Sequence, residues 1–200
     1  MENIISVILI AISTFAVTNI DDLLILSIYF TNPDYKKSNV VAGQYLGVIT
    51  LIGISLLGLL LGKVLEPAWV GLLGLVPIFI GVKDIMKFFK TTKVVEKSNP
   101  ISVKSKIQFL NVMLVTIANG GDNIGVYAPL FASSSIDLVI IFIVVFVLMI
   151  ALWCLLAFYF VKHSLIKTAF AKFGHTILPF FLILLGIWIL FESKSFKLLY

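Results

Sequence analysis

Three aspartates are unusual because each lies inside an apolar stretch of the sequence. Asp21 and Asp22 occur in the segment TNIDDLLIL, and Asp122 occurs in ANGGDNIGVY. Placing one carboxylate at membrane depth costs about 2.5 to 3.5 kcal/mol, and the same stretches contain no lysine that neutralises the charge. The pattern therefore predicts that a bound cation or bound protons balance these carboxylates.

Side-chain amides accompany the aspartates in both segments. Carboxylate and amide oxygens are ligands that suit hard divalent cations. We predict one metal site that both segments build, with these ligands: Asp21, Asp22, Asp122, Asn19, Asn119 and Asn123. The alternative interpretation is that these groups only join helices through hydrogen bonds, at about 0.6 kcal/mol each.

The helices that carry these residues must open locally if all the ligands face one site. Neighbouring residues on a helix point about 100° apart, so Asp21 and Asp22 share a site only at a break or between two packed neighbours. Glycines are poor helix formers, and an opened backbone at Gly120 and Gly121 would expose carbonyl oxygens. The candidates for lining the ion's pathway are Thr18, Gly120, Gly121, Gln44 and Tyr127.

The composition places these segments in a membrane protein. The 200 residues are 60% hydrophobic and 12% charged, whereas about a quarter of the residues in a soluble domain are charged. Most of the surface must therefore face lipid, which excludes a secreted module, a disordered tail and a nucleic-acid-binding protein. All fifteen basic residues are lysines, and loop lysines that orient membrane helices explain the net positive charge. The expected partners are the bilayer and the transported cation, with no resident cofactor.

Apolar runs of about 20 residues predict membrane-spanning helices. The chain contains six such runs, at residues 4–30, 40–62, 68–89, 107–131, 138–161 and 176–191. Pro77 and Pro179 fall inside the third and sixth runs. Proline is tolerated there because neighbouring helices satisfy the carbonyl groups that it frees.

The lysines are concentrated in alternate loops. Twelve of the fifteen lie in the first, third and fifth loops, which predicts that these loops are cytoplasmic and that both termini lie outside the cell. The basic stretch 91–106 divides the chain into a first half, 1–90, and a second half, 107–200. We expect it to set topology or to meet anionic lipid.

The two halves share a polar pattern that indicates an internal repeat. Asn19 and Asn119 are one hundred positions apart, as are Asp22 and Asp122. Three spans in each half is an odd number, so the second half must insert upside down relative to the first. The predicted fold class is therefore all-α: a polytopic membrane protein with six transmembrane helices in two inverted three-helix repeats.

Other residues received weaker interpretations. His163 and His175 lie at the ends of the last two spans, where a solvated or capping role is more usual than metal binding. Cys154 is the single cysteine, which excludes a disulfide framework within one chain, and a lone cysteine in an apolar helix is usually a packing residue. Small residues in the second span are expected to allow close helix contacts; they are Gly43, Gly47, Gly53 and Gly58.

The chain resembles the CadD family of cadmium resistance transporters, within the broader lysine-exporter superfamily. The resemblance lies in TNIDDLLIL and ANGGDNIGVY, the basic central loop, the segments GLVPIFIG and GHTILPFFLILLG, and the length. It implies a plasma-membrane permease that exports cadmium and confers resistance, with the aspartate-bearing first and fourth helices at its centre. Cd²⁺ favours thiolate ligands, but weak oxygen ligation is compatible with the exchangeable binding that a transporter needs.

The predicted function is export of a divalent cation, with cadmium implied by the resemblance, and not an enzymatic reaction. The sequence contains no GxxxxGK[ST] phosphate-binding loop. The membrane potential opposes the export of positive charge, so we expect proton exchange to drive it. The alternatives are an exporter of cationic amino acids such as lysine, and an intramembrane aspartyl protease. The protease motif GxGD is not matched, because Asn119 stands two residues before Gly121.

Overall fold

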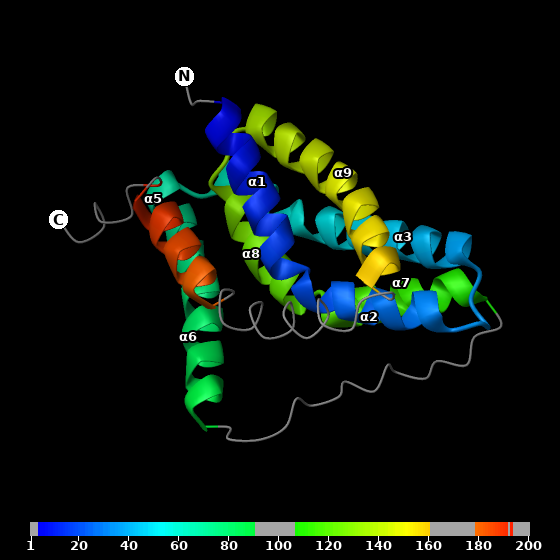
Figure 1. The fold of residues 1–200 in the computed structure, drawn as a ribbon. Coiled ribbons are helices and arrows are strands. Elements are labelled where there is room, and N and C mark those ends of the chain that lie inside the picture. The colour runs from blue at the N-terminus through cyan, green and yellow to red at the C-terminus, as the bar shows by residue number, and fades with distance from the viewer. Residues whose placement is uncertain (1–3, 91–106, 161–178, 192, 194–200) are drawn as a thin grey trace.

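The computed structural model describes residues 4–90, 107–160, 179–191 and 193, and every regular element in these ranges is a helix (Figure 1). This confirms the predicted all-α class for the described residues. Two helices, Lys37–Val64 and Ile136–Tyr159, are long and apolar enough to cross a membrane. The bent pair Ile4–Thr18 and Ile20–Thr31 is a third candidate span. The other apolar helices are shorter, so the arrangement of six spans stays a prediction.

Two of the predicted spans are broken in the middle. The first consists of α1 (Ile4–Thr18) and α2 (Ile20–Thr31), which are bent by 59° at Asn19. The fourth consists of α7 (Gln108–Asn119) and α8 (Gly121–Ala132), with Gly120 between them. The backbone angles at the two breaks are similar, with φ −113° and ψ 19° at Asn19 and φ −83° and ψ 21° at Gly120. The N–H and carbonyl groups of Asn19 and Gly120 keep hydrogen-bond partners along the chain, so each break interrupts a helix inside an apolar run without unwinding it.

Each broken pair packs along longer helices. The segment α3 (Lys37–Ser55) lies beside α7, and its continuation α4 (Leu57–Val64) packs on α8. The helix α9 (Ile136–Phe160) packs on both α1 and α2, and Figure 1 shows α1 running alongside it. The helix α9 therefore covers the first break, and α3 packs against the second.

The third predicted span, 68–89, is not one continuous helix. It contains α5 (Pro67–Gly71), a 3-10 turn (Leu72–Gly74) and α6 (Leu75–Lys90). Pro77 lies in the first turn of α6, where a missing N–H breaks no intrahelical hydrogen bond. The helix Pro179–Phe191 is the described part of the sixth predicted span, and Figure 1 shows it beside α6. Residues 161–178 and the linker 91–106 lie outside the described residues.

Glycines allow the closest helix contacts, as predicted for three of the four positions. A Cβ atom on Gly43 would lie 2.5 Å from the carbonyl oxygen of Phe109, and one on Gly58 would lie 2.2 Å from that of Ala128. Gly47 faces α7 in the same way. The prediction is wrong for Gly53, where an added Cβ would meet nothing within 4 Å. Gly53 lies about 80° around α3 from Gly43 and about 120° from Gly47.

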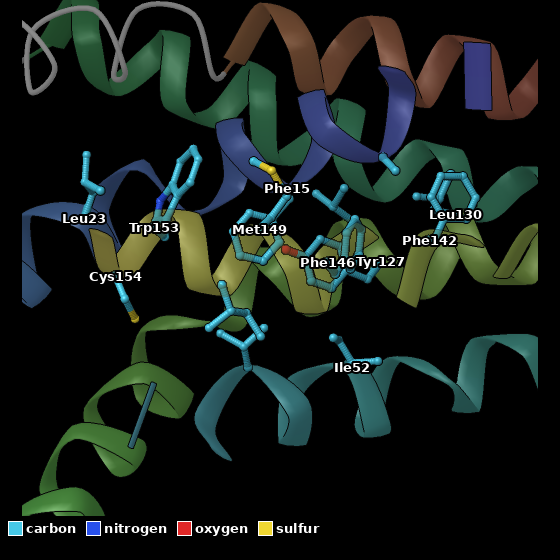
Figure 2. Packing of buried hydrophobic residues seen from close by; sticks show 14 of the residues in the cluster. Phe15, Leu23, Ile52, Tyr127, Leu130, Phe142, Phe146, Met149, Trp153 and Cys154 are labelled. Atoms are coloured by element: carbon cyan, nitrogen blue, oxygen red, sulfur yellow. The ribbon is translucent and has the colours of Figure 1, made fainter. Parts of the chain in front are cut away.

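The apolar core lies next to the first break. The Phe15 and Trp153 rings meet edge to face with centroids 5.5 Å apart, and the Tyr127 and Phe146 rings are 4.6 Å apart. Figure 2 shows these rings gathered along α9. Cys154 is buried in the same cluster, in agreement with its predicted role as a packing residue. The residues around the first break therefore pack against a rigid aromatic surface.

Candidate functional site

The helix breaks place carboxylates at the N-termini of α2 and α8. Asp21 and Asp122 are each the second residue of their helix. The Oδ1 atom of Asp21 accepts a hydrogen bond of 2.9 Å from the backbone N–H of Asp22, and Asp122 Oδ1 accepts one of 2.9 Å from that of Asn123. A helix N-terminus offers unpaired N–H groups and the positive end of the helix dipole, both of which favour a carboxylate.

This geometry changes which residues of the two segments correspond to each other in the repeat. From Asn19 to Gly120, the two break residues, the chain advances 101 positions and not 100. In this register Asp21 corresponds to Asp122, and Asp22 corresponds to Asn123. The two halves therefore differ at the third residue of the helix after the break, which is the carboxylate Asp22 in α2 and the amide Asn123 in α8.

Asn119 joins the two segments. Its Nδ2 atom donates to Asp21 Oδ2 at 2.6 Å and to Asp22 Oδ1 at 3.3 Å. Asn119 is the last residue of α7, and the aspartates are in the first turn of α2. The predicted ligands Asp21, Asp22 and Asn119 thus form one hydrogen-bonded group.

Gln44 and Thr116 extend this group through the closely packed pair α3 and α7. Gln44 Nε2 donates to Asp22 Oδ2 at 2.9 Å, and Thr116 Oγ1 donates to Gln44 Oε1 at 2.7 Å. All three side chains are buried. The sequence had placed Gln44 on the pathway, but Thr116 was missed. The available signal was its spacing, because a residue three positions before Asn119 lies on the same face of the helix.

A second buried network surrounds the first break. Asn19 Nδ2 donates to the Tyr127 hydroxyl at 2.8 Å, and Asn19 Oδ1 accepts from Asn123 Nδ2 at 3.2 Å. The Thr18 hydroxyl lies 3.0 Å from that of Tyr127. These predicted residues are brought together, and Tyr127 is fully buried inside the protein.

Trp153 supports the break from α9. Its Nε1 atom donates to the backbone oxygen of Asn19 at 2.7 Å, and the same oxygen accepts from the backbone N–H of Leu23 at 3.2 Å. The sequence did not identify Trp153, because a single tryptophan in an apolar helix has no distinguishing pattern. The contact depends on how α9 packs against α1 and α2.

The family comparison decides what kind of protein carries this site. A family model described as cadmium resistance transporter matches residues 15–200, which include both breaks and every residue named in the two networks. The chain belongs to the cadmium resistance transporter family. Comparisons with curated proteins and with solved structures gave no match. Family membership confirms the resemblance found in the sequence and supports a membrane protein that transports cadmium.

Both broken segments of this cadmium resistance transporter offer amide oxygens beside the carboxylates. Among the described residues, no three His, Cys, Asp or Glu side chains are placed so that they could hold a metal ion. Amide and hydroxyl oxygens are the other ligand-type atoms near the two breaks. One such atom is Asn123 Oδ1, which is buried without a hydrogen-bond partner.

Two glycines at the second break, Gly120 and Gly121, have different surroundings. A Cβ atom on Gly120 would lie 2.2 Å from a methyl carbon of Leu51, so this position packs tightly against α3. Gly121 is exposed, and an added Cβ would meet nothing within 4 Å. Gly120 therefore serves helix packing, while Gly121 keeps the start of α8 accessible. His163 and His175 lie outside the described residues.

Proposed function

We propose that this transporter exports Cd²⁺ from the cytoplasm across the plasma membrane in exchange for protons, and that the cation binds between the two helix breaks. The observation that carries the proposal is the contact of Asn119 with Asp21 and Asp22. It joins ligand-type side chains from both halves of the chain where both helices are broken. Broken helices with sites at their breaks are a common arrangement in secondary transporters.

The proposed architecture is two inverted repeats, 1–90 and 107–200, joined by the cytoplasmic linker 91–106, with six spans and both termini outside. Two observations support it. Each half contains a broken helix of matching backbone geometry, and each half follows it with a long helix, α3 with α4 in one case and α9 in the other. An interface between inverted halves allows the site to open to either side in turn.

The amides provide a mechanism for exchanging ligands. An amide presents its nitrogen to a carboxylate and its oxygen to a cation. Rotation of the Asn119 side chain would withdraw its donor from Asp21 and Asp22 and turn Oδ1 toward an arriving ion. Protons leave the carboxylates toward the cytoplasm when the cation binds, and protons from outside the cell take their place when the cation is released there. This chemistry suits a site that must hold Cd²⁺ only briefly, since oxygen ligands bind it less tightly than thiolates.

The energetics favour exchange over uncoupled export. Moving one positive charge against the membrane potential costs about 2.3 kcal/mol per 100 mV, and a divalent cation carries two charges. Protons that enter as the cation leaves offset this cost. A soluble nucleotide-binding domain is not predicted anywhere in the sequence.

Uptake into inverted membrane vesicles tests the proposal. Their cytoplasmic face points outward, so export appears as accumulation. We expect the protein to accumulate Cd²⁺ when the lumen is acidic, and a protonophore to abolish the accumulation. Uptake that persists without a proton gradient would contradict proton exchange. An excess of lysine should not compete, and strong competition by lysine would favour the exporter of cationic amino acids.

A further inference from the structure

We infer that Thr116 is a positioning residue for the cation site: its hydroxyl orients the Gln44 amide, which in turn holds the Asp22 carboxylate. The inference rests on the proposed function, because it assigns a role to Asp22 in binding the transported ion. Gln44 stands between Thr116 and Asp22 in the series of hydrogen bonds, so Thr116 acts on the carboxylate through Gln44.

The geometry forms a continuous series across three helices. Thr116 on α7 donates to Gln44 Oε1 at 2.7 Å, and Gln44 on α3 donates to Asp22 Oδ2 on α2 at 2.9 Å. Gln44 is completely inaccessible to solvent, and Asp22 and Thr116 are each 3% exposed. Water therefore cannot easily replace either hydrogen bond, so the orientation of each side chain depends on its neighbour in the series.

The chemistry of the groups sets the direction of the series. An ionised carboxylate only accepts hydrogen bonds, so Gln44 must turn its Nε2 atom toward Asp22. Its Oε1 atom then faces α7 and requires a donor. The Thr116 hydroxyl is that donor. Without it, the buried Gln44 oxygen loses its partner and the orientation of the amide is no longer specified.

The Thr116 hydroxyl is used differently from two hydroxyls on α3. Those of Thr50 and Ser55 donate to the carbonyl four residues earlier in their own helix, which is the usual local bond. The Thr116 hydroxyl donates across the interface between α3 and α7 instead. The interface is close enough because Gly47 has no side chain, and a Cβ there would lie 2.7 Å from Thr116 Cβ.

The consequence for transport concerns affinity more than the rate of the conformational change. Gln44 holds Oδ2 of Asp22, while Asn119 contacts Oδ1. The carboxylate is thereby fixed in one rotamer, with Asn119 as the partner that an ion displaces. Loss of Thr116 would leave Asp22 in several orientations, and binding would have to select the productive one.

Transport kinetics in inverted vesicles test the inference. Thr116→Val keeps the branched shape but removes the hydroxyl, and we expect it to raise KM for Cd²⁺ about three- to tenfold with little change in the maximal rate. Thr116→Ser retains the donor and should have nearly the unaltered KM. Thr50→Val is the matched control, since its hydroxyl bonds only within α3 in this structure, and it should not change KM. Thr116→Ala provides the same comparison if the valine variant does not accumulate in the membrane.

A double-mutant cycle establishes whether Thr116 acts through Gln44. Gln44→Leu should raise KM at least as much as Thr116→Val, and adding Thr116→Val to Gln44→Leu should have no further effect. Additive effects, or an unaltered KM in Thr116→Val, would overturn the inference. Asp22→Asn distinguishes a failure of the positioning role from a failure of the proposed cation site. If it stops transport while Thr116→Val is unaltered, only the positioning role fails; if Asp22→Asn transports normally, Asp22 does not bind the ion, and this part of the proposed site fails together with the inference.

Discussion

The amide nitrogen of Asn119 lies 2.6 Å from Asp21 Oδ2, although 98 positions separate the two residues in the chain. The contact joins the end of α7 to the first turn of α2, so it connects one helix break to the other. Both side chains are partly buried, and the bond requires both residues to be correctly placed. Asn119 therefore joins the two halves of the chain, as Asn123 and Tyr127 do through Asn19.

Removal of the Asn119 amide should weaken the site. Asn119→Ala removes the Oδ1 atom that the proposed mechanism turns toward the ion, and a contact between a polar group and a charge contributes about 1.5 to 3 kcal/mol. We expect Cd²⁺ uptake by inverted vesicles to fall at least tenfold at low Cd²⁺ concentration. Asn32→Ala is the control, because the Asn32 side chain bonds to the loop N–H of Asp34. Equal loss in both variants would indicate a general folding defect.

Trp153→Phe should destabilise the first break. The substitution retains an aromatic ring against Phe15 but removes the N–H that donates to the backbone oxygen of Asn19. The expected loss is about 0.5 to 1.5 kcal/mol, seen as a lower midpoint of thermal unfolding in detergent together with slower transport. Trp69→Phe, at a position that is 53% exposed on α5, should leave both unchanged. An unaltered midpoint in Trp153→Phe would show that the bond does not support the break.

Gly58→Ala and Gly53→Ala should have opposite effects on stability. At Gly58 the new Cβ would lie 2.2 Å from the Ala128 carbonyl oxygen, so α4 and α8 must move apart at a cost of about 1 to 3 kcal/mol. At Gly53 nothing lies within 4 Å, and alanine should stabilise the helix by about 0.5 to 1 kcal/mol. Thermal unfolding of the two variants measures this. A destabilised Gly53→Ala would show that its face contacts something in the membrane, such as a second copy.

The predicted orientation can be tested by labelling introduced cysteines. In a Cys154→Ser background, Asp34→Cys should react with a membrane-impermeant maleimide in inverted vesicles and not in intact cells. Ser135→Cys, in the exposed loop before α9, should show the reverse. Solubilised protein of both variants should react fully, as the control for accessibility. Reaction of both positions from the same side would contradict the proposed spans.

The sequence predicted the parts of the site that depend on polarity alone. A carboxylate or an amide inside an apolar run is visible without knowledge of packing, and Asn119 and the three aspartates were identified in this way. The sequence did not show which residues of the two halves correspond to each other. Residue types match at a spacing of 100, whereas the breaks are 101 apart, because Asn19 and Gly120 occupy the same backbone position with different side chains.

Contacts between helices were the information that the sequence lacked. Whether a residue faces a neighbour depends on the rotation of each helix about its axis, which an almost uniformly apolar sequence does not specify. For this reason Gly53 was assigned to a helix interface wrongly, and Thr116 and Trp153 were overlooked. The third span was also predicted as one continuous helix, because apolar content does not reveal the 3-10 turn before Pro77.

The central claim is that carboxylates at the two breaks bind the transported ion, and Cd²⁺ uptake by inverted vesicles under an imposed proton gradient tests it most directly. Unaltered protein should be compared with Asp22→Asn, Asp122→Asn and the control Asp137→Asn, whose side chain is exposed at the start of α9. We predict that the first two variants lose most of their uptake while Asp137→Asn keeps it. Full uptake by both Asp22→Asn and Asp122→Asn would contradict the site.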